Sequence, residues 1–316
     1  MKCLPASSSR CSDPRLAMNA APCDGDHVRP GWVDEGLFPF TSRFVELSGN
    51  VVHYVDEGDG PILLMLHGNP TWSFVYRDVI AELSGSFRCI APDYPGFGLS
   101  TPAPGYQFHP ADHARLVGEF VDRLDLRDVT LIAQDWGGPI GLAAALPRRD
   151  RFSRLVVGNT WAWPVNGDPH FELFSHFMGG PIGRQLIRHF NFFVNAMIPA
   201  GHRRRKVSAA EMGHYRLALP TPQRREPTAI FPKDITAART FLADLEHGLT
   251  EFVDMPTLIV WGDADIAFRA KERQRWENLM SRHHTVVLAG AGHYLQSDAP
   301  IDFSDAVRTW CNDGRV

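Results

Sequence analysis

Six short, almost uninterrupted apolar runs recur along the chain, and they constrain its fold more than any other feature. Runs of this kind are typical of strands that are buried on both faces of a parallel sheet. Stretches with apolar residues at helical spacing separate them, near 73–84, 110–124, 137–146, 267–281 and 299–311. Strands that alternate with helices predict a doubly wound α/β sheet. The six runs are ILLMLHG (62–68), FRCIAPD (87–93), VTLIAQD (129–135), RLVVGN (154–159), TLIVWGD (257–263) and HTVVLAG (284–290).

Two further strands are expected before these runs, at 43–49 and 51–58. The second alternates apolar and polar residues, and Gly49-Asn50 between the two is a hairpin signal. The whole pattern predicts an eight-stranded, mostly parallel sheet flanked by helices.

The interval 161–248 breaks this rhythm, because it has helical patterns but no buried-strand signal. It is too long to be a loop, so we expect an inserted helical cap there. The core is then expected to comprise 31–160 and 249–316. Residues 1–30 are rich in Ser, Pro and Cys and show no period, which indicates a flexible N-terminal arm.

Composition argues against several classes of function. The chain has 316 residues and a formal net charge of −4, which does not favour a nucleic-acid partner. No apolar stretch approaches the length of about 18 residues that a membrane-spanning helix needs. The five cysteines lack metal-ligand spacing and indicate free thiols in the cytoplasm. No phosphate-binding, dinucleotide or HExxH motif occurs, so neither cofactor nor metal is implied. Three cysteines lie in the arm, which leaves association into a homo-oligomer open.

Polar residues cluster where the expected strands end, and sites of α/β sheets form at that edge. An acidic residue in the elbow pattern Ala133-Gln134-Asp135-Trp136-Gly137 is followed by a second acid and then by a histidine, which is the chain order of α/β-hydrolases. The helix that follows Asp135 favours its anionic form. The alternative for Asp135 is a plain helix N-cap. The strand-end residues are His67, Gly68, Asn69, Gln134, Asp135, Trp136, Asn159, Asp263, Asp265 and His293.

An aspartate at such an elbow suits displacement at a saturated carbon. A serine would form an ether there, which water and histidine do not readily cleave. A carboxylate forms an ester, whose carbonyl carbon water can attack. Asp135 therefore indicates a leaving group on an sp³ carbon, as in alkyl halides and epoxides.

His293 is the candidate general base for hydrolysis of that ester, and an acid should orient its ring. Asp263 and Asp265 compete for this role, and we favour Asp265 because it lies further along the loop. Asp263 is then expected to brace the turn. Asn159 occupies a third strand end but cannot serve as an anionic partner.

Five motifs resemble those of haloalkane dehalogenases: HGNPTWSF, DYPGFGLS, QDWGG, WGDADIAF and GAGHYLQSDAP, within residues 32–312. The resemblance implies an α/β-hydrolase fold and halide binding by the Asn69 amide and the Trp136 indole. It also implies that the backbone N–H groups of Asn69 and Trp136 form an oxyanion hole. The partners would be a small apolar halogenated substrate, water and a halide ion. His67 is expected to support its loop.

Three alternatives are weighed against a dehalogenase. An epoxide hydrolase uses the same Asp-His-acid chemistry but needs hydroxyl groups, usually two cap tyrosines, and Tyr215 is the only tyrosine in the presumed cap. A luciferase-like oxygenase that needs no cofactor would retain the same residues. A non-enzymatic binding protein would be expected to lack Asp135, His293 or the acid that orients the histidine.

The presumed cap is rich in phenylalanine. Most of these side chains are expected to pack internally and a few to face the pocket: Phe171, Phe174, Phe177, Phe190, Phe192 and Phe193.

Overall fold

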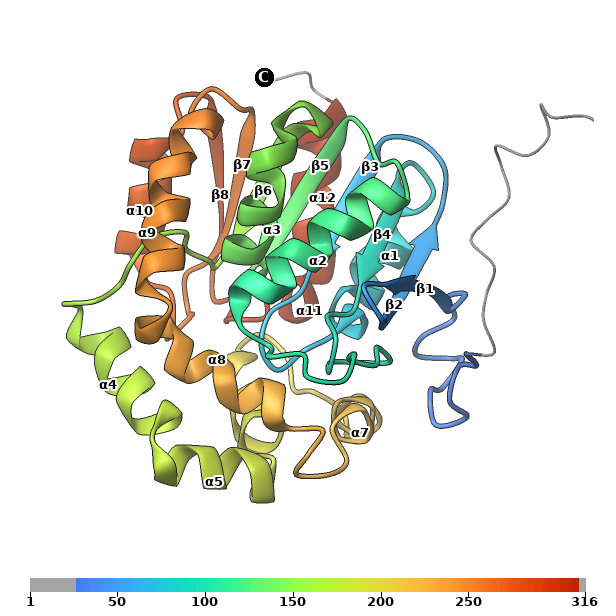
Figure 1. Ribbon diagram of the computed structural model, residues 1–316. Helices are drawn as coiled ribbons and strands as arrows, with labels where there is room; N and C mark the ends of the chain where they lie inside the picture. The colour runs from blue at the N-terminus through green and yellow to red at the C-terminus, as the bar shows by residue number, and fades with distance from the viewer. Residues whose placement is uncertain (1–26, 313–316) are drawn as a thin grey trace, which may run out of the picture.

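The computed structural model describes residues 27–312, which contain one twisted sheet of eight strands (Figure 1). The strand order is β1-β2-β4-β3-β5-β6-β7-β8. The pairs β1–β2 and β2–β4 are antiparallel, and the other neighbours run parallel. The predicted eight-stranded, mostly parallel sheet is confirmed. The strands are β1 (Arg43–Leu47), β2 (Asn50–Glu57), β3 (Ile62–Leu66), β4 (Arg88–Pro92), β5 (Val129–Gln134), β6 (Phe152–Gly158), β7 (Thr257–Gly262) and β8 (His283–Leu288).

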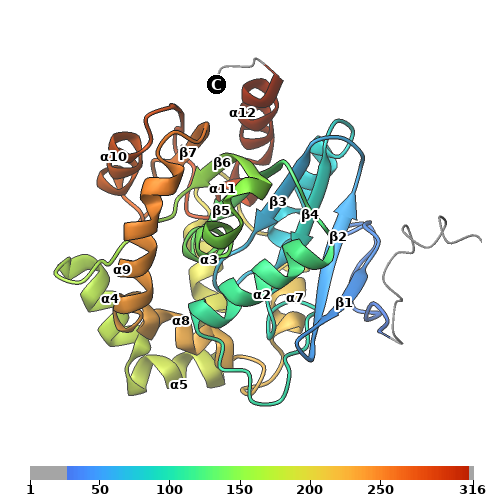
Figure 2. The same cartoon turned by 45° about the horizontal axis from the view of Figure 1, so that its top comes forward.

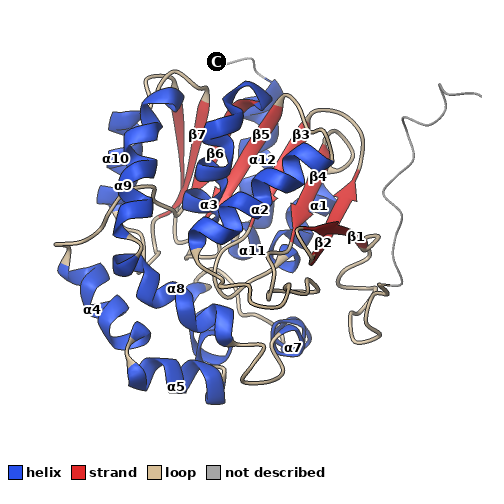
Figure 3. Ribbon diagram, viewed as in Figure 1, coloured by secondary structure: helices blue, strands red, loops and turns tan. Residues whose placement is uncertain are grey.

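Helices cover both faces of the sheet, as the layers in Figure 3 show. One face packs against α2 (Pro110–Arg123), α3 (Gly137–Ala145) and α10 (Ala270–Leu279) in a large apolar core. The other face packs against α1 (Arg77–Leu83), α11 (Leu295–Asp298) and α12 (Pro300–Asn312) in a second core. Short helical turns precede α1 at Ser73–Tyr76 and follow α3 at Leu146–Arg151.

The segment between β6 and β7 is helical, and most of it lies across the carboxyl ends of the strands (Figure 1). Its last helix, α9, instead packs against α3 and runs beside the sheet toward α10 (Figure 2). The division into a core and a cap stays a prediction of the sequence. The helices are α4 (Pro169–Gly179), α5 (Pro181–Phe190), the π-helical turn η3 (Phe193–Met197), α6 (Ile198–Gly201), α7 (Ala209–Ala218), α8 (Glu226–Ala237), α9 (Arg239–Gly248) and the turn η4 (Leu249–Phe252).

Two local expectations are wrong. The first hairpin turns at Ser48-Gly49, one residue earlier than expected, because Leu47 pairs with Asn50 and both turn residues have positive φ. The strand β8 is not buried on both faces. It is the last strand of the sheet and Val287 is 43% exposed. An apolar run therefore did not distinguish an edge strand from a central one.

The expected arm at 1–30 lies outside the described residues except for its last four positions. None of the helices within 27–312 is both long and apolar enough to cross a membrane. The cytoplasmic location and the homo-oligomer stay predictions.

Candidate active site

Asp135 lies on a sharp turn between β5 and α3. Its φ is +50°, a conformation that non-glycine residues seldom adopt and that the surrounding structure must enforce. The Asp135 N–H donates to the Asn159 carbonyl at 3.0 Å, and the Thr160 hydroxyl donates to the Asp135 carbonyl at 2.6 Å. The N-cap of α3 is Trp136, without a side-chain capping bond. The Asp135 carboxylate is therefore free of the plain capping role.

Backbone donors hold this carboxylate from the side of the β3 loop and the start of α3. The Asn69 N–H donates to Asp135 Oδ1 at 2.8 Å, and the Trp136 N–H also hydrogen-bonds to the carboxylate. The pKa of Asp135 is raised, because the effect of burial exceeds the lowering effects of His293 and of the two N–H donors. The two N–H groups expected from the sequence thus converge on one carboxylate.

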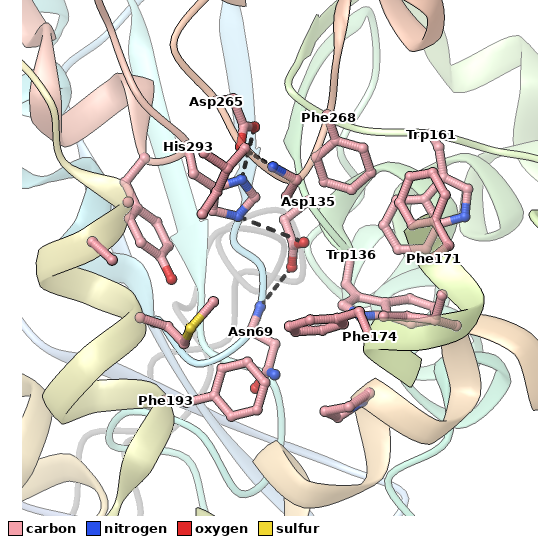
Figure 4. A pocket seen from close by; sticks show the side chains of 18 of the residues that line it. Asn69, Asp135, Trp136, Trp161, Phe171, Phe174, Phe193, Asp265, Phe268 and His293 are labelled. Atoms are coloured by element: carbon pink, nitrogen blue, oxygen red, sulfur yellow. Dashed lines mark hydrogen bonds and ion pairs between the residues drawn. The ribbon is translucent and has the colours of Figure 1, made fainter. Parts of the chain in front are cut away.

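His293 lies between two carboxylates from different loops (Figure 4). Its Nδ1 is 2.9 Å from Asp265 Oδ2, and its Nε2 is 3.7 Å from Asp135 Oδ2. Burial disfavours the charged imidazole, but Asp265 and Asp135 outweigh this effect, so the pKa of His293 is raised. Nε2 is the ring nitrogen that faces Asp135, as a general base acting there would require.

Asp265 rather than Asp263 contacts the histidine. Asp265 also accepts from the Asn159 side chain and from the Ala267 N–H, both at 2.7 Å, which fixes its carboxylate. Asp263 instead accepts from the Gly290 N–H at 2.6 Å and braces the turn after β8. The donor role of Asn159 was missed, although its position at a strand end was the signal for it.

His67 lies beneath the Asn69 loop and does not face the cavity. Its Nε2 accepts from the Tyr94 N–H at 3.1 Å, and its Nδ1 is 3.0 Å from the Gly68 carbonyl. Burial lowers the pKa of His67 to about 4, so the ring is neutral near pH 7. The ring thus braces the loop, as expected.

A cavity of about 190 Å³ opens beside Asp135 and has mainly apolar walls (Figure 4). Phe171, Phe174 and Phe193 line it, but Phe177 and Phe190 are 53% and 69% exposed. The expectation of internal packing is wrong for these last two. The other residues that line the cavity are Asn69, Asp135, Trp136, Trp161, His170, Met197, Ala200, Gly201, Pro232, Ile235, Asp265, Ile266, Ala267, Phe268, His293 and Tyr294.

Asn69 and Trp136 both line this cavity. The Trp136 ring packs against Trp161 and Phe231, with ring centroids 4.7 and 4.9 Å away. Within the described residues, the side-chain NH₂ group of Asn69 has a single long hydrogen bond of 3.5 Å, to the Thr228 carbonyl. The part of the chain at 27–312 has no cluster of His, Cys, Asp or Glu that could hold a metal ion.

Residues 61–300 match the α/β hydrolase fold family. The chain is 45% identical over 276 residues to haloalkane dehalogenase 2 of Mycobacterium tuberculosis H37Rv. This match covers 87% of this chain and 96% of that protein. It is 32% identical over 272 residues to a cis-3-alkyl-4-alkyloxetan-2-one decarboxylase of Shewanella oneidensis, over 83% and 86% of the two chains.

Among solved structures, an ancestral haloalkane dehalogenase superposes with a TM-score of 0.78 at 30% identity. The match covers 86% of this chain and 98% of that one. The chain therefore belongs to the α/β-hydrolase fold family and, within it, to the haloalkane dehalogenases.

Proposed function

We propose that the protein hydrolyses haloalkanes to a primary alcohol, a halide ion and a proton through an alkyl ester of Asp135. The observation that carries this proposal is a buried carboxylate on an elbow, with His293 Nε2 3.7 Å from its Oδ2 and an apolar cavity beside it. A small apolar halogenated substrate fits such a cavity.

In the first half-reaction, Asp135 Oδ2 attacks the carbon that carries the halogen. The new carbon–oxygen bond forms as the carbon–halogen bond breaks, and the halide leaves with the bonding electron pair. Protonation does not usefully assist the departure of a halide, so N–H groups must stabilise its negative charge through hydrogen bonds. We assign this role to the Asn69 amide and the Trp136 indole, which both line the cavity.

In the second half-reaction, water attacks the Cγ atom of the Asp135 ester while His293 Nε2 takes its proton. Asp265, 2.9 Å from Nδ1, stabilises the imidazolium that forms. The negative charge develops on Oδ1, which the Asn69 N–H already contacts at 2.8 Å. Collapse of this intermediate breaks the bond between Cγ and the oxygen that carries the alkyl group. The alkoxide takes the proton of the added hydroxyl and leaves as the alcohol, Asp135 is again a carboxylate, and the imidazolium then loses its proton to solvent.

The phenylalanines of α4 and η3 support a cap over residues 161–248 that encloses the substrate. Phe171, Phe174 and Phe193 turn toward the cavity and exclude water from the halide. Donors in such a dry site are more effective than donors in water.

An epoxide hydrolase remains the alternative, and the tyrosines argue against it. Tyr215, the one tyrosine of the cap, is buried against Phe74 with ring centroids 5.3 Å apart, and it does not line the cavity. Tyr294 is the tyrosine in the cavity wall, so the described residues lack a pair of hydroxyls there. Halide departure needs no such pair.

The test is the release of halide and protons from 1,2-dibromoethane and 1-bromohexane by the full chain. We expect both products in equal amounts. Turnover of styrene oxide without halide release from either bromide would make the protein an epoxide hydrolase instead.

Replacing Trp136 by phenylalanine should keep the ring but remove the indole N–H. Loss of one preorganised donor to developing charge lowers kcat by about 10²- to 10³-fold. We expect such a loss in steady-state bromide release. Trp163→Phe is a matched control, since that ring lies outside the cavity against Trp276. If Trp136→Phe and Trp163→Phe released bromide at equal rates, Trp136 would not be a halide-binding residue.

Gly68→Ala should disturb Asp135 directly, because a Cβ atom at Gly68 would lie 2.2 Å from Asp135 Oδ1. Displacement of a reacting group by about 1 Å can cost about 10²-fold in rate. We expect that loss in halide release together with a lower Tm. Gly213→Ala on α7 meets no atom within 4 Å and should retain the rate. An unchanged rate in Gly68→Ala would show that the loop adapts.

A further inference from the structure

A buried glutamine contacts the ring nitrogen that the hydrolysis step uses. Gln134 ends β5, is 3% exposed, and precedes the nucleophile in the chain. Its Nε2 lies 3.2 Å from His293 Nε2 and 3.1 Å from the His293 carbonyl oxygen. Nothing in the reaction described so far uses this side chain.

The neighbours determine which end of the Gln134 amide faces the histidine. A carbonyl oxygen only accepts, so the amide group 3.1 Å from the His293 carbonyl must be the NH₂ end. The Gln296 side chain, itself 1% exposed, donates to Gln134 Oε1 at 3.3 Å and favours the same orientation. The NH₂ group has two hydrogens, one for the carbonyl and one for His293 Nε2.

An amide NH₂ group has no acceptor, so its contact with His293 Nε2 is favourable only while that nitrogen carries a lone pair. The single proton of the neutral ring is then on Nδ1, and this N–H donates a hydrogen bond to the Asp265 carboxylate. This is the tautomer that can take a proton from water. If Nε2 were protonated, two N–H groups would oppose each other 3.2 Å apart in a buried site.

The two carboxylates that face His293 act in the opposite direction. Asp265 and Asp135 are the two carboxylates beside the ring, and both favour its charged form. The remaining neighbours, Phe268 and Tyr294, pack on the ring as aromatic groups. Gln134 is thus the side chain that opposes early protonation.

We propose that Gln134 is a positioning residue that keeps His293 Nε2 unprotonated until water enters for ester hydrolysis. This role rests on the proposed function. Its variants should change the titration of His293 and the hydrolysis step, and leave the displacement step, which transfers no proton, nearly unchanged.

The first test is an NMR titration of the His293 ring in the full chain. Gln134→Glu places an acceptor at Nε2 and should raise the pKa of His293 by about one unit or more. Gln134→Met, of similar length, removes the donor and should raise it by less. Gln185→Glu on the exposed side of α5 makes the same charge change elsewhere and should leave it unaltered. An unchanged His293 pKa in both Gln134 variants would overturn the proposal.

The second test separates the two half-reactions with 1-bromohexane. In Gln134→Met the rate of bromide release in a single turnover, with the protein in excess, should stay within about threefold of the unaltered protein, while the acidic limb of steady-state hexanol formation moves to higher pH. Equal acidic limbs would contradict the role of Gln134. Absence of any bromide release by the unaltered protein would instead contradict the proposed function, and the NMR titration would still report on Gln134.

Discussion

Replacing Asp135 by asparagine is expected to abolish halide release from 1-bromohexane. The amide has nearly the shape of the carboxylate, and its oxygen can still accept from the Asn69 N–H that lies 2.8 Å from Oδ1. It carries no negative charge, so it cannot displace a halide at useful rates. Removal of an attacking group typically costs about 10⁴- to 10⁶-fold in kcat, and we expect a loss in this range.

Bromide release by freshly purified Asp135→Asn, with its intact mass confirmed, provides the measurement. Asp263→Asn is the matched control, because it makes the same change at an exposed carboxylate that braces the turn after β8. That variant should retain most of the rate. Residual activity within tenfold of the unaltered protein in Asp135→Asn would mean that another group attacks the substrate.

His293→Gln is expected to stop the reaction after its first half. Displacement by Asp135 transfers no proton and should proceed, whereas hydrolysis of the ester lacks its base. The protein should release one equivalent of bromide and gain the mass of one hexyl group. Asp265 keeps two other donors, Asn159 and the Ala267 N–H, so this variant should still fold.

Intact mass spectrometry after incubation with 1-bromohexane detects the trapped ester, and peptide mapping should place it on Asp135. The double variant Asp135→Asn/His293→Gln should gain no mass, and His284→Gln, on the exposed edge strand β8, should turn over normally. Continued multiple turnover in His293→Gln would show that another base acts. A hexyl group on any other residue would displace Asp135 as the nucleophile.

Much of the scaffold could be predicted because it depends on local pattern. Apolar runs of four to six residues and helical spacing indicate burial, and burial determines which segments form the sheet and which cover it. The carboxylate at position 135 predicted an ester intermediate on alkyl halides or epoxides, because water can attack the carbonyl carbon of an ester but does not readily cleave an ether. Halide binding by Asn69 and Trp136 was predicted from the resemblance to the family and stays a prediction.

Other features depend on packing between distant segments, which no local pattern contains. Asp263 and Asp265 are two residues apart in similar company, and only the loop backbone turns one toward His293 and the other toward Gly290. The exposure of β8 depends on its place in the strand order. Phe171 and Phe177 belong to one helix, but only Phe171 lines the cavity.

The contact between Gln134 and His293 shows the same distinction within the site. The two residues are 159 positions apart, and their side chains meet because β5 lies inside the sheet and the loop after β8 folds back over its end. The sequence by itself predicted the sheet, the strand-end cluster and an ester intermediate. The tertiary structure decided which acid contacts His293, which aromatic rings form the cavity wall and which amide faces the His293 ring. Hydrophobic periodicity encodes burial, whereas the convergence of side chains requires backbone geometry in three dimensions.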